Sequence, residues 1–390
     1  PLAVGGLELE KDLLPGAPDG AARQGDHQMR LAHGRLALHG VQLAQQGAEE
    51  LELVGVAHRA VRLLGLDFGQ EQFDLLGPHR VIVRDMVIDY IRAWRGSRFL
   101  MWRNIDAKHF DIFDASDVVI LGGDYGPCQA PRDDPSCVSR IAGRAARVTV
   151  DGARIHGITS TNLSSYHVEG MFVRGGRNIV IRNSRFFGNM VTNIRFQAQL
   201  CCSNSDVLLE NNWFAPPLEA DGATPRWDAV DIDTPIDQLV IRNNSFLESG
   251  PLLVGTYQRA RVVGNLLTNY VCGDGVTYAR NLFVPFSRWN GVEPCGLTDR
   301  RVRTLGFVNR KAFNLRLRPD SPAYAAGDPN DCAATDIERR PRLRGLKCDA
   351  GAYELQDAWV CERGRSARIA LKHVRARLKS GGTIGRCRRR

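Results

Sequence analysis

The sequence predicts an all-β protein whose central part is a right-handed parallel β-helix, in which short strands wind around one axis. The first observation is a phrase of apolar or β-branched residues, then a polar residue, then Asn, Asp or Gly, which recurs nine times between residues 81 and 281. The second is its spacing of 16 to 32 residues, which suits coils with added loops. The third is that alternating side chains of such short strands would fill a cylinder.

The copies follow one another along residues 79–310, the predicted β-helix. They begin at Val81, Leu100, Val119, Val148, Ile179, Val207, Leu239, Arg261 and Thr277. Asn, Asp and Gly tolerate left-handed backbone angles, so we expect them at the bends, and we expect Asn to stack from coil to coil. A β-sandwich would show more regular turn spacing and a propeller a longer period, so both explain the pattern less well.

Residues 1–78 differ from the rest, because residues 1–67 contain no Phe, Trp, Tyr or Ile. Three interpretations stay open: an N-terminal cap over the open edge of the cylinder, a disordered segment, or a non-authentic one such as out-of-frame translation. As part of a cap, residues 41–64 would form a helix, since Ala, Gln, Glu and Leu are good helix formers.

The end of the chain loses the repeat. We expect residues 311–355 to be a closing coil and C-terminal plug, and residues 356–390 to be a short basic tail with a helix over Ala367–Lys379. From Cys361 onward there are eleven Lys or Arg and one acid, so the tail carries the whole net charge of +9. The tail is either a solvated end or a site for an anionic polymer. Nucleic acid is disfavoured, because aromatic residues do not interleave the basic ones.

Ten cysteines and no CxxC unit favour disulfides and an oxidising compartment, so we expect a secreted or cell-surface protein. Reduced thiols in a cytosolic protein are the alternative. The expected pairs are Cys128–Cys137, Cys272–Cys295, Cys332–Cys348 and Cys361–Cys387, with Cys201 and Cys202 unassigned. No apolar run of 18 residues suggests a transmembrane segment. We expect a monomer.

The phrase Arg177–Phe186 (RNIVIRNSRF) resembles the repeat of secreted bacterial β-helix proteins of the pectate-lyase-like superfamily. Ser321–Pro329 and Cys348–Glu354 (CDAGAYE) are similar to the closing segment of cell-surface (choice-of-anchor) members, although Ala350 stands where Ile is frequent. The resemblance covers about residues 80–355. It implies the fold more strongly than the activity, because members include polysaccharide lyases, glycoside hydrolases, epimerases and proteins without known activity.

Three segments before successive Asn phrases carry the candidate site. If Tyr166–Gly170, Thr192–Phe196 and Asp228–Asp233 lie on one face, their polar side chains would stack along the axis. Alternation then brings together five candidate catalytic residues, which are His167, Glu169, Arg195, Asp231 and Asp233. Tyr166, Asn193 and Trp227 are the candidate substrate-binding residues.

Such a cluster has two catalytic uses. In a hydrolase, Glu169 with Asp231 or Asp233 would supply the acid and the second carboxylate. In a lyase acting on uronic acids, Arg195 would be base or clamp, and Asp231 and Asp233 would offer oxygen ligands to Ca²⁺, although no cofactor is required. A solvated, salt-bridged face is the alternative. The expected function is polysaccharide binding, with cleavage by lyase or hydrolase chemistry, and the rival is a non-catalytic surface or adhesion protein of the same fold.

Overall fold

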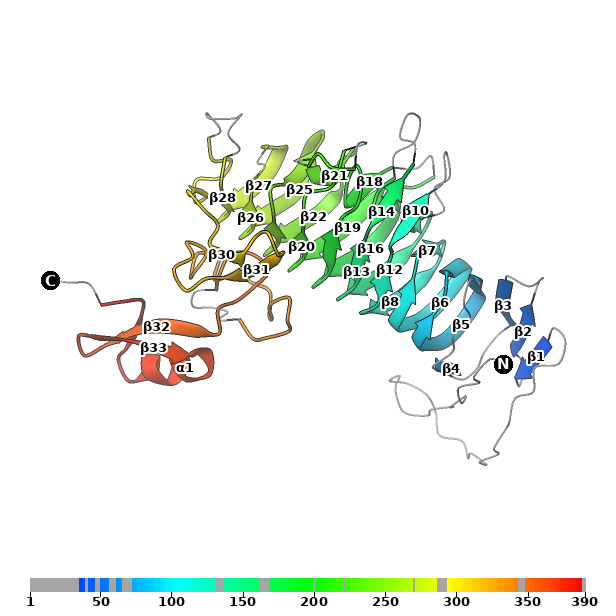
Figure 1. Ribbon diagram of the computed structural model, residues 1–390, viewed down its shortest axis with the longest axis horizontal. Helices are drawn as coiled ribbons and strands as arrows, with labels where there is room; N and C mark the ends of the chain where they lie inside the picture. The colour runs from blue at the N-terminus through cyan, green and yellow to red at the C-terminus, as the bar shows by residue number, and fades with distance from the viewer. Residues whose placement is uncertain are drawn as a thin grey trace, which may run out of the picture.

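The structure is a computed structural model. It describes the strands at 35–38, 41–45, 50–55 and 61–64, and residues 72–130, 137–161, 168–198, 201–219, 222–226, 228–268, 271–285, 293–342 and 348–387. The described chain is almost entirely β, and its helix is α1 (Leu371–Lys379). Stacked strands form an elongated body with the C-terminal segments at one end (Figure 1).

Most strands belong to three stacks, here called the first, second and third face. The first face consists of β7 (His109–Phe113), β11 (Ser139–Ala142), β15 (Met171–Arg174), β18 (Ile194–Gln197), β21 (Asp228–Ile232) and β24 (Gly250–Leu253). The second consists of β8 (Ser116–Leu121), β12 (Ala146–Asp151), β16 (Gly176–Arg182), β19 (Asn204–Glu210), β22 (Asp237–Arg242), β25 (Thr256–Val263) and β27 (Asp274–Ala279). The third consists of β9 (Asp124–Tyr125), β13 (Arg154–His156), β17 (Arg185–Phe187), β20 (Trp213–Phe214), β23 (Ser245–Phe246), β26 (Leu266–Leu267), β28 (Leu282–Phe283) and β29 (Arg300–Arg301).

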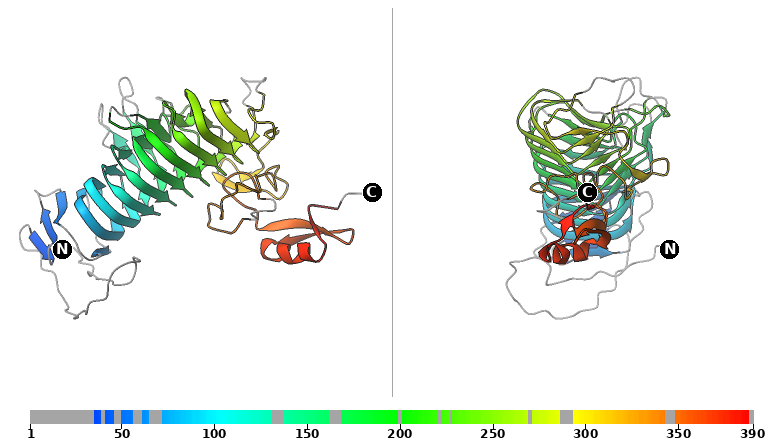
Figure 2. Two further views of the ribbon diagram at one scale, coloured as in Figure 1. Left: turned by 180° about the vertical axis from the view of Figure 1, so that it is seen from behind. Right: turned by 90° about the vertical axis from the view of Figure 1, so that its left-hand side faces the viewer.

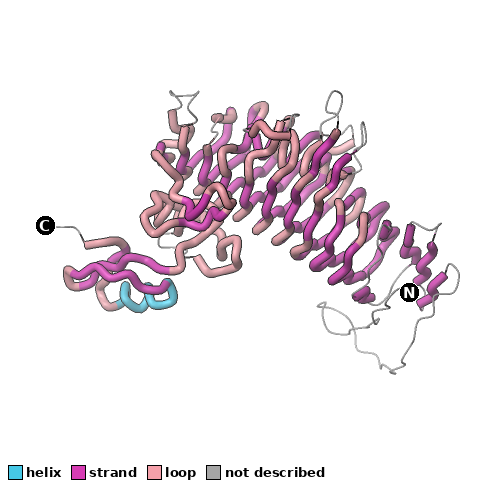
Figure 3. The backbone as a smooth tube through the Cα atoms, in the orientation of Figure 1, coloured by secondary structure: helices cyan, strands magenta, loops and turns pink. Residues whose placement is uncertain are grey.

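Within each stack every strand pairs in parallel with its equivalent in the next coil. The long strands β5 (Gln72–Val87) and β6 (Tyr90–Ala107) each run through all three faces. The stacked rungs are visible from behind in Figure 2 and as parallel magenta segments in Figure 3. The chain is therefore a parallel β-solenoid, which confirms the predicted winding of short strands.

The predicted register is right for most copies of the phrase and wrong for three. Ile179 pairs with Val207 and Val207 with Leu239, as expected. The third, eighth and ninth copies begin one residue earlier than predicted, at Val118, Ala260 and Val276. The reason lies at the bend, where each coil needs one left-handed residue.

The left-handed residue is Asn in some coils and Gly or another residue in others. Asn183, Asn211 and Asn243 have φ near +53°, and Gly264 (φ 63°) takes the equivalent place in the eighth copy. The predicted start at Arg261 puts Asn265 at this bend, but Asn265 lies one residue beyond it. The bend residue is Gly264, and because glycine and asparagine both suit a left-handed position, the sequence did not distinguish the two.

A ladder of buried asparagines runs one position beyond the bend. The backbone N–H of each member donates to the side-chain oxygen of the next, at 2.8–3.0 Å through Asn212, Asn244, Asn265 and Asn281. Asp299 ends the ladder by accepting from the N–H of Asn281 at 2.7 Å. The expected stacking of Asn also occurs at the bend itself, where Asn211 Nδ2 donates to Asn183 Oδ1 at 3.4 Å.

The inside of the cylinder is apolar and fully buried. Phe186, Phe214 and Phe246 stack in successive coils, with ring centroids 5.0 and 4.7 Å apart. Each buried aromatic side chain contributes roughly 1.5–3 kcal/mol relative to an exposed one. The alternation of inward and outward side chains along each strand follows from this core.

The N-terminal segment contains strands where we expected a helix. β1 (Arg35–Leu38), β2 (Val41–Gln45) and β3 (Glu50–Gly55) form an antiparallel meander. β3 and β4 (Val61–Leu64) both pair in parallel with β5. The helix expected over residues 41–64 is wrong, because the open edge of β5 offers backbone hydrogen bonds that a strand satisfies and a helix does not.

Residues 305–342 and 348–355 cover the side of the cylinder. Leu305, Phe307 and Leu315 pack with the outward side chains of the third face, including Trp213 and Leu266, into a second apolar core. β30 (Phe307–Asn309) and β31 (Asn314–Leu317) form a hairpin within this segment, here called the lateral cover. We predicted a closing coil and C-terminal plug for residues 311–355, and the described part of this segment packs along the flank of the third face.

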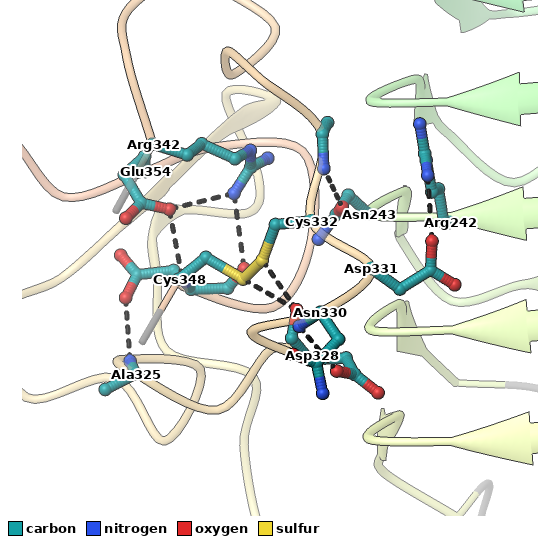
Figure 4. The surroundings of a disulfide bond; sticks show 12 residues. Arg242, Asn243, Ala325, Asp328, Asn330, Asp331, Cys332, Arg342, Cys348 and Glu354 are labelled. Carbon is teal, nitrogen blue, oxygen red and sulfur yellow. Dashed lines mark hydrogen bonds and ion pairs between the residues drawn. A yellow bond between two sulfur atoms is a disulfide. The ribbon is translucent and has the colours of Figure 1, made fainter. Parts of the chain in front are cut away.

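Residues of the lateral cover bind the bends of two successive coils. Figure 4 shows the contacts at one of them, beside Arg242 and Asn243. Asn243 Oδ1 accepts from the N–H of Ala333 at 3.0 Å, and Arg242 binds Asp331 at 2.8 Å. Arg342, whose side chain is fully buried, binds Glu354 at 2.9 Å and donates to Asn211 at 2.8 Å. Contacts at two consecutive bends explain why the cover lies along the axis.

The closing motif Cys348–Glu354 has a structural role. The two oxygens of Asp349 accept from the N–H groups of Ala325 and Leu355, both at 2.7 Å. A Cβ on Gly351 (φ 86°) would lie 2.6 Å from Leu266 Cδ1, so this position requires glycine. Burial and the neighbouring Glu354 raise the pKa of Asp349 well above its ordinary value.

The C-terminal residues fold into a small domain, where we expected a basic tail. β32 (Asp357–Glu362), β33 (Arg365–Ala370) and β34 (Thr383–Ile384) form a sheet, and α1 packs on it through Val374 and Leu378. The predicted helix over Ala367–Lys379 is right only from Leu371, because Ala367–Ala370 pair with β32. We call residues 356–387 the C-terminal module; it stands clear of the coils, at the C-terminal end of the solenoid, in the left view of Figure 2.

All four predicted disulfides are present, which are Cys128–Cys137, Cys272–Cys295, Cys332–Cys348 and Cys361–Cys387. The adjacent Cys201 and Cys202, unassigned from the sequence, pair with each other. No helix in the described part of the chain is long and apolar enough to cross a membrane.

Candidate functional site

One row of residues runs along the outer side of the first face, one residue from each coil. We call it the central row, and it consists of Asp74, Arg92, Asp111, Arg140, Phe172, Arg195 and Asp231. Neighbours in such a row lie about 4.8 Å apart along the axis. Carboxylates and guanidinium groups alternate along most of it, so most of these charges face an opposite charge in the next coil.

Strand alternation places the charged side chains outward. In β18, Ile194 and Phe196 are fully buried in the cylinder, so Arg195 and Gln197 lie on the outside. In β21, Val230 and Ile232 point inward, which leaves Asp231 outside and directly opposite Arg195. The predicted parity of Arg195 and Asp231 is therefore correct.

The third predicted segment, Tyr166–Gly170, is displaced from its expected strand. The strand of that coil is β15, which begins at Met171, so Phe172 is the residue that pairs with Arg195. Glu169 lies before the strand, and the N–H of the following Gly170 donates to Thr192 O at 3.0 Å. Polar and apolar residues alternate over Tyr166–Glu169 but not over Met171–Arg174 (MFVR), so the sequence pattern favoured the wrong segment.

Arg195 brings three of the predicted residues together. Its Nη2 lies 2.7 Å from Asp233 Oδ2, and its Nε lies 2.9 Å from the same oxygen. Its Nη1 donates to Glu169 Oε1 at 3.3 Å, and its Nε lies 3.8 Å from Asp231 Oδ2. We call Glu169, Arg195, Asp231 and Asp233 the Arg195 cluster; it unites four of the five predicted catalytic residues.

Exposure divides the carboxyl groups of the cluster. The side chains of Asp231 and Asp233 are 14% and 24% exposed, whereas that of Glu169 is 0% exposed. Asp231 and Asp233 are therefore partly exposed, with Asp231 Oδ1 itself buried, and Glu169 is enclosed beside the guanidinium.

Burial changes the proton affinity of two carboxyl groups. It raises the pKa of Glu169 to about 7, against the opposing effect of Arg195. Burial and the neighbouring Asp233 raise the pKa of Asp231 to about 6, again opposed by Arg195. Both groups consequently titrate near neutrality, which is the range useful for proton transfer.

Arg174 is a neighbour that the sequence analysis missed. Its guanidinium lies 4.1 Å from the centroid of the Phe172 ring. Burial lowers the pKa of Arg174, while the charge of Glu169 opposes that effect. If the predicted strand had been Met171–Arg174, alternation would have put Arg174 on the outer side together with Phe172.

The remaining predicted residues lie elsewhere or outside the described residues. Asn193 is fully buried; its Nδ2 donates to Ala215 O at 2.7 Å and its Oδ1 accepts from Asn189 at 2.9 Å. These internal hydrogen bonds use both ends of the amide, so Asn193 supports the loop rather than facing solvent. Tyr166, His167 and Trp227 lie outside the described residues.

A second group of polar and aromatic residues continues the first face toward the N-terminus. Tyr90 donates to Asp111 at 2.5 Å and stacks on His109 with ring centroids 4.1 Å apart. Arg140 binds Asp111 through two hydrogen bonds. Burial lowers the pKa of His109 to about 3, with Arg140 adding to the effect, so this imidazole stays neutral.

An aromatic pair lies beside this group. Trp94 and Phe113 stack with centroids 5.0 Å apart, and the guanidinium of Arg92 lies 4.6 Å from the Trp94 ring. Both rings are partly exposed on the outer side of the first face. The sequence analysis left these residues out of the site, because they belong to the first coils rather than to the central ones.

The donor set does not fit the predicted Ca²⁺ site. Ca²⁺ takes six to eight oxygen ligands, but the oxygen of Asp233 that faces the cluster already binds Arg195. Among the described residues, no three His, Cys, Asp or Glu side chains are arranged to hold a metal ion. The arrangement is that of a carboxylate–guanidinium cluster.

The site is a strip of charged and aromatic side chains along one face of the solenoid, with two partly exposed carboxyl groups held by Arg195. Compared with known proteins, the chain matches no protein-family model and no curated protein significantly.

Proposed function

We propose that the protein is a secreted polysaccharide hydrolase with a right-handed parallel β-helix. It binds an extended sugar polymer along the outer side of the first face and cleaves it at the Arg195 cluster. One observation carries the proposal: two partly exposed carboxyl groups, Asp231 and Asp233, share one guanidinium, and one of them holds its proton to a pKa of about 6.

The two carboxyl groups suit the two roles of glycoside hydrolysis. Asp231 in its protonated form donates to the leaving glycosidic oxygen, and Asp233, which lies 2.7 Å from Arg195 Nη2, activates water or attacks the sugar. Glu169 is a positioning residue, because its buried carboxyl contacts Arg195 and not the surface.

The length of the strip suits a polymer better than a small ligand. Phe113 and Asp233 lie four rungs apart on the first face, which is about 19 Å along the axis. An oligosaccharide of several sugars spans that length, and the flat rings of Trp94 and Phe113 match the C–H face of a sugar.

Two further parts of the proposal have indirect support. Five disulfides suit an oxidising compartment outside the cytosol. Right-handed winding follows the strong general preference of parallel strands for right-handed crossovers. Membership of the pectate-lyase-like superfamily rests on the resemblance of the repeat and of the closing motif.

A screen of acidic and neutral polysaccharides tests the proposal, with new reducing ends and unsaturated products measured separately. The wild-type protein is expected to release reducing ends from at least one polymer without unsaturated products. Asp231→Asn and Asp233→Asn are each expected to lower kcat by at least about 100-fold.

Asp237→Asn is the matched control, because Asp237 forms an equivalent ion pair with Arg259 on the second face. It should keep full activity. Unsaturated products would instead indicate lyase chemistry on uronic acids. Polymer binding without any cleavage would favour the non-catalytic surface protein and overturn the hydrolase.

A further inference from the structure

The C-terminal module is a second candidate binding site, independent of the first face. Between residues 356 and 387 there are eight Lys or Arg and two acids, Asp357 and Glu362. Each acid binds one arginine: Asp357 binds Arg368 at 2.5 Å and Glu362 binds Arg377 at 3.1 Å. The module therefore presents a net positive charge of six, whereas the chain before it is close to neutral.

The C-terminal module has its own apolar core and a disulfide, so its charged side chains extend from a fixed backbone. Val360 and Val374 are buried between the sheet and α1, and Cys361–Cys387 joins β32 to the end of the module. The N–H of Trp359 donates to Tyr324 of the lateral cover at 2.9 Å, which attaches the module to the rest of the protein. A merely solubilising basic tail would need neither a core nor a disulfide.

One side of the β32–β33 hairpin combines an aromatic ring with two arginines. Trp359 lies directly opposite Arg368 in the antiparallel pair, so the two side chains share a face. Val360 points the other way, toward α1, so this face is turned away from the helix. The guanidinium of Arg386 lies 4.1 Å from the centroid of the Trp359 ring.

We propose that the C-terminal module binds an anionic polysaccharide through Trp359, Arg368 and Arg386, and so holds the protein on an acidic polymer. A guanidinium binds a sugar carboxylate through two parallel hydrogen bonds, and an indole ring packs against the C–H face of the sugar. Stacking on Trp359 and pairing with Asp357 orient the two guanidinium groups in advance. A single aromatic residue on this face suits a sugar chain better than the stacked bases of a nucleic acid.

The test measures binding of the full-length protein to polygalacturonate, with neutral dextran as the uncharged polymer. The double variant R368Q/R386Q is expected to bind polygalacturonate at least about tenfold more weakly than the wild type. The wild-type affinity should also fall at least about tenfold between about 50 and 300 mM NaCl, a readout that needs no variant. Binding to dextran should be unaffected by either change.

A matched variant separates this site from net charge. R103Q/R144Q removes two exposed arginines from the solenoid and should leave the affinity within about twofold. Loss of binding in R103Q/R144Q but not in the module variant would place the polymer on the solenoid and overturn the inference.

Duplex DNA and vesicles of phosphatidylglycerol are the competing ligands. Tighter binding of either than of polygalacturonate, lost in R368Q/R386Q, would assign the module to that ligand and overturn the inference. Equal binding of polygalacturonate by the module variant and the wild type would also overturn it. A catalytically inactive protein that still binds through the module would leave this inference standing and refute only the hydrolase.

Discussion

Glu169 shows how one buried carboxyl group ties stability to the site. Its side chain is fully buried, and its partner Arg195 also binds the accessible Asp233. The folded protein holds the proton of Glu169 up to a pKa of about 7, whereas the ordinary value is 4.5. Because the folded state binds this proton more tightly than the unfolded chain, the contribution of Glu169 to stability is full below about pH 4.5 and is lost as pH rises to about 7.

Replacing Glu169 by Gln is expected to remove that pH dependence, since the amide does not titrate. Between about pH 5 and 7.5 the wild type should lose up to about 3 kcal/mol of unfolding free energy at this residue, and E169Q should not. Urea unfolding at the two pH values measures the difference. An identical loss in both proteins would show that Glu169 is not the titrating group.

Asp231 gives the pH dependence of the proposed reaction. Its proton is required for leaving-group departure, and its pKa is about 6. We expect kcat/KM to fall about tenfold for each unit of pH above that value. In E169Q, one negative charge near Arg195 is lost above about pH 7, so the alkaline part of the profile should shift while the acid part is unchanged. A profile that rises through pH 6 would exclude Asp231 as the acid.

At the scale of the element, the asparagine ladder fixes the register of the coils. Asn244 accepts from the N–H of Asn212, and its own Nδ2 donates to Leu209 O at 2.9 Å. Each member satisfies buried groups in its own coil and in a neighbouring one, so the ladder resists slippage.

Asn244→Ala is expected to lower the free energy of unfolding by about 3 kcal/mol, because it leaves buried donors and acceptors unpaired. Gln258→Ala, an exposed position on β25, is the control and should change stability by less than about 0.5 kcal/mol. Thermal or urea unfolding measures both. Equal stability of the two variants would mean that the ladder does not contribute to the fold.

The aromatic pair of Trp94 and Phe113 tests the length of the binding strip. Trp94→Ala is expected to raise KM about tenfold for long polymers and to leave kcat unchanged, because the ring contacts sugars several units from the cleaved bond. Short oligosaccharides that end before Phe113 should be cleaved with an unaltered KM. An equal loss for long and short substrates would place the polymer elsewhere.

The sequence predicted the elements better than their exact offsets. Recurring apolar strands and polar bends are sufficient to predict parallel stacking, because a strand that alternates in this way buries one side wherever it lies. When the predicted start of a strand is wrong by one or more residues, the apolar pattern still fits, but each residue is assigned the wrong partner in the next coil. This happened at Gly264 and at Glu169. The pairing of Asp231 with Arg195 was predictable from parity, whereas the proximity of Arg174 depended on an offset that only the backbone reveals.

At the scale of the whole molecule, the lateral cover ties distant segments to the flank of the solenoid. Arg339 binds Asp151 at 2.9 Å across 188 residues of sequence, and Gly351 N–H donates to Gly264 O at 2.8 Å. The position of the lateral cover could not be predicted from the sequence, because its residues carry no repeat. Its partners are residues at the bends of the coils, which the sequence pattern alone would leave exposed to solvent.

Gly351→Ala is expected to loosen the cover, since a Cβ there would clash with Leu266 and glycine supplies the φ of 86°. The variant should lose about 1–3 kcal/mol and become cleavable by trypsin within residues 305–355. Gly364→Ala, with a similar φ of 75° but open space around its Cβ, is the control. Protection of both variants alike would show that close packing at Gly351 does not hold the cover in place.

The central claim is that the outer side of the first face binds and cleaves a polysaccharide at the Arg195 cluster. A crystal structure of the D231N variant with an oligosaccharide of the cleaved polymer tests it most directly. We predict a sugar chain along the axis, with the glycosidic oxygen about 3 Å from residue 231 and a ring over Trp94. A chain bound on the second or third face, or on the C-terminal module alone, would contradict the account.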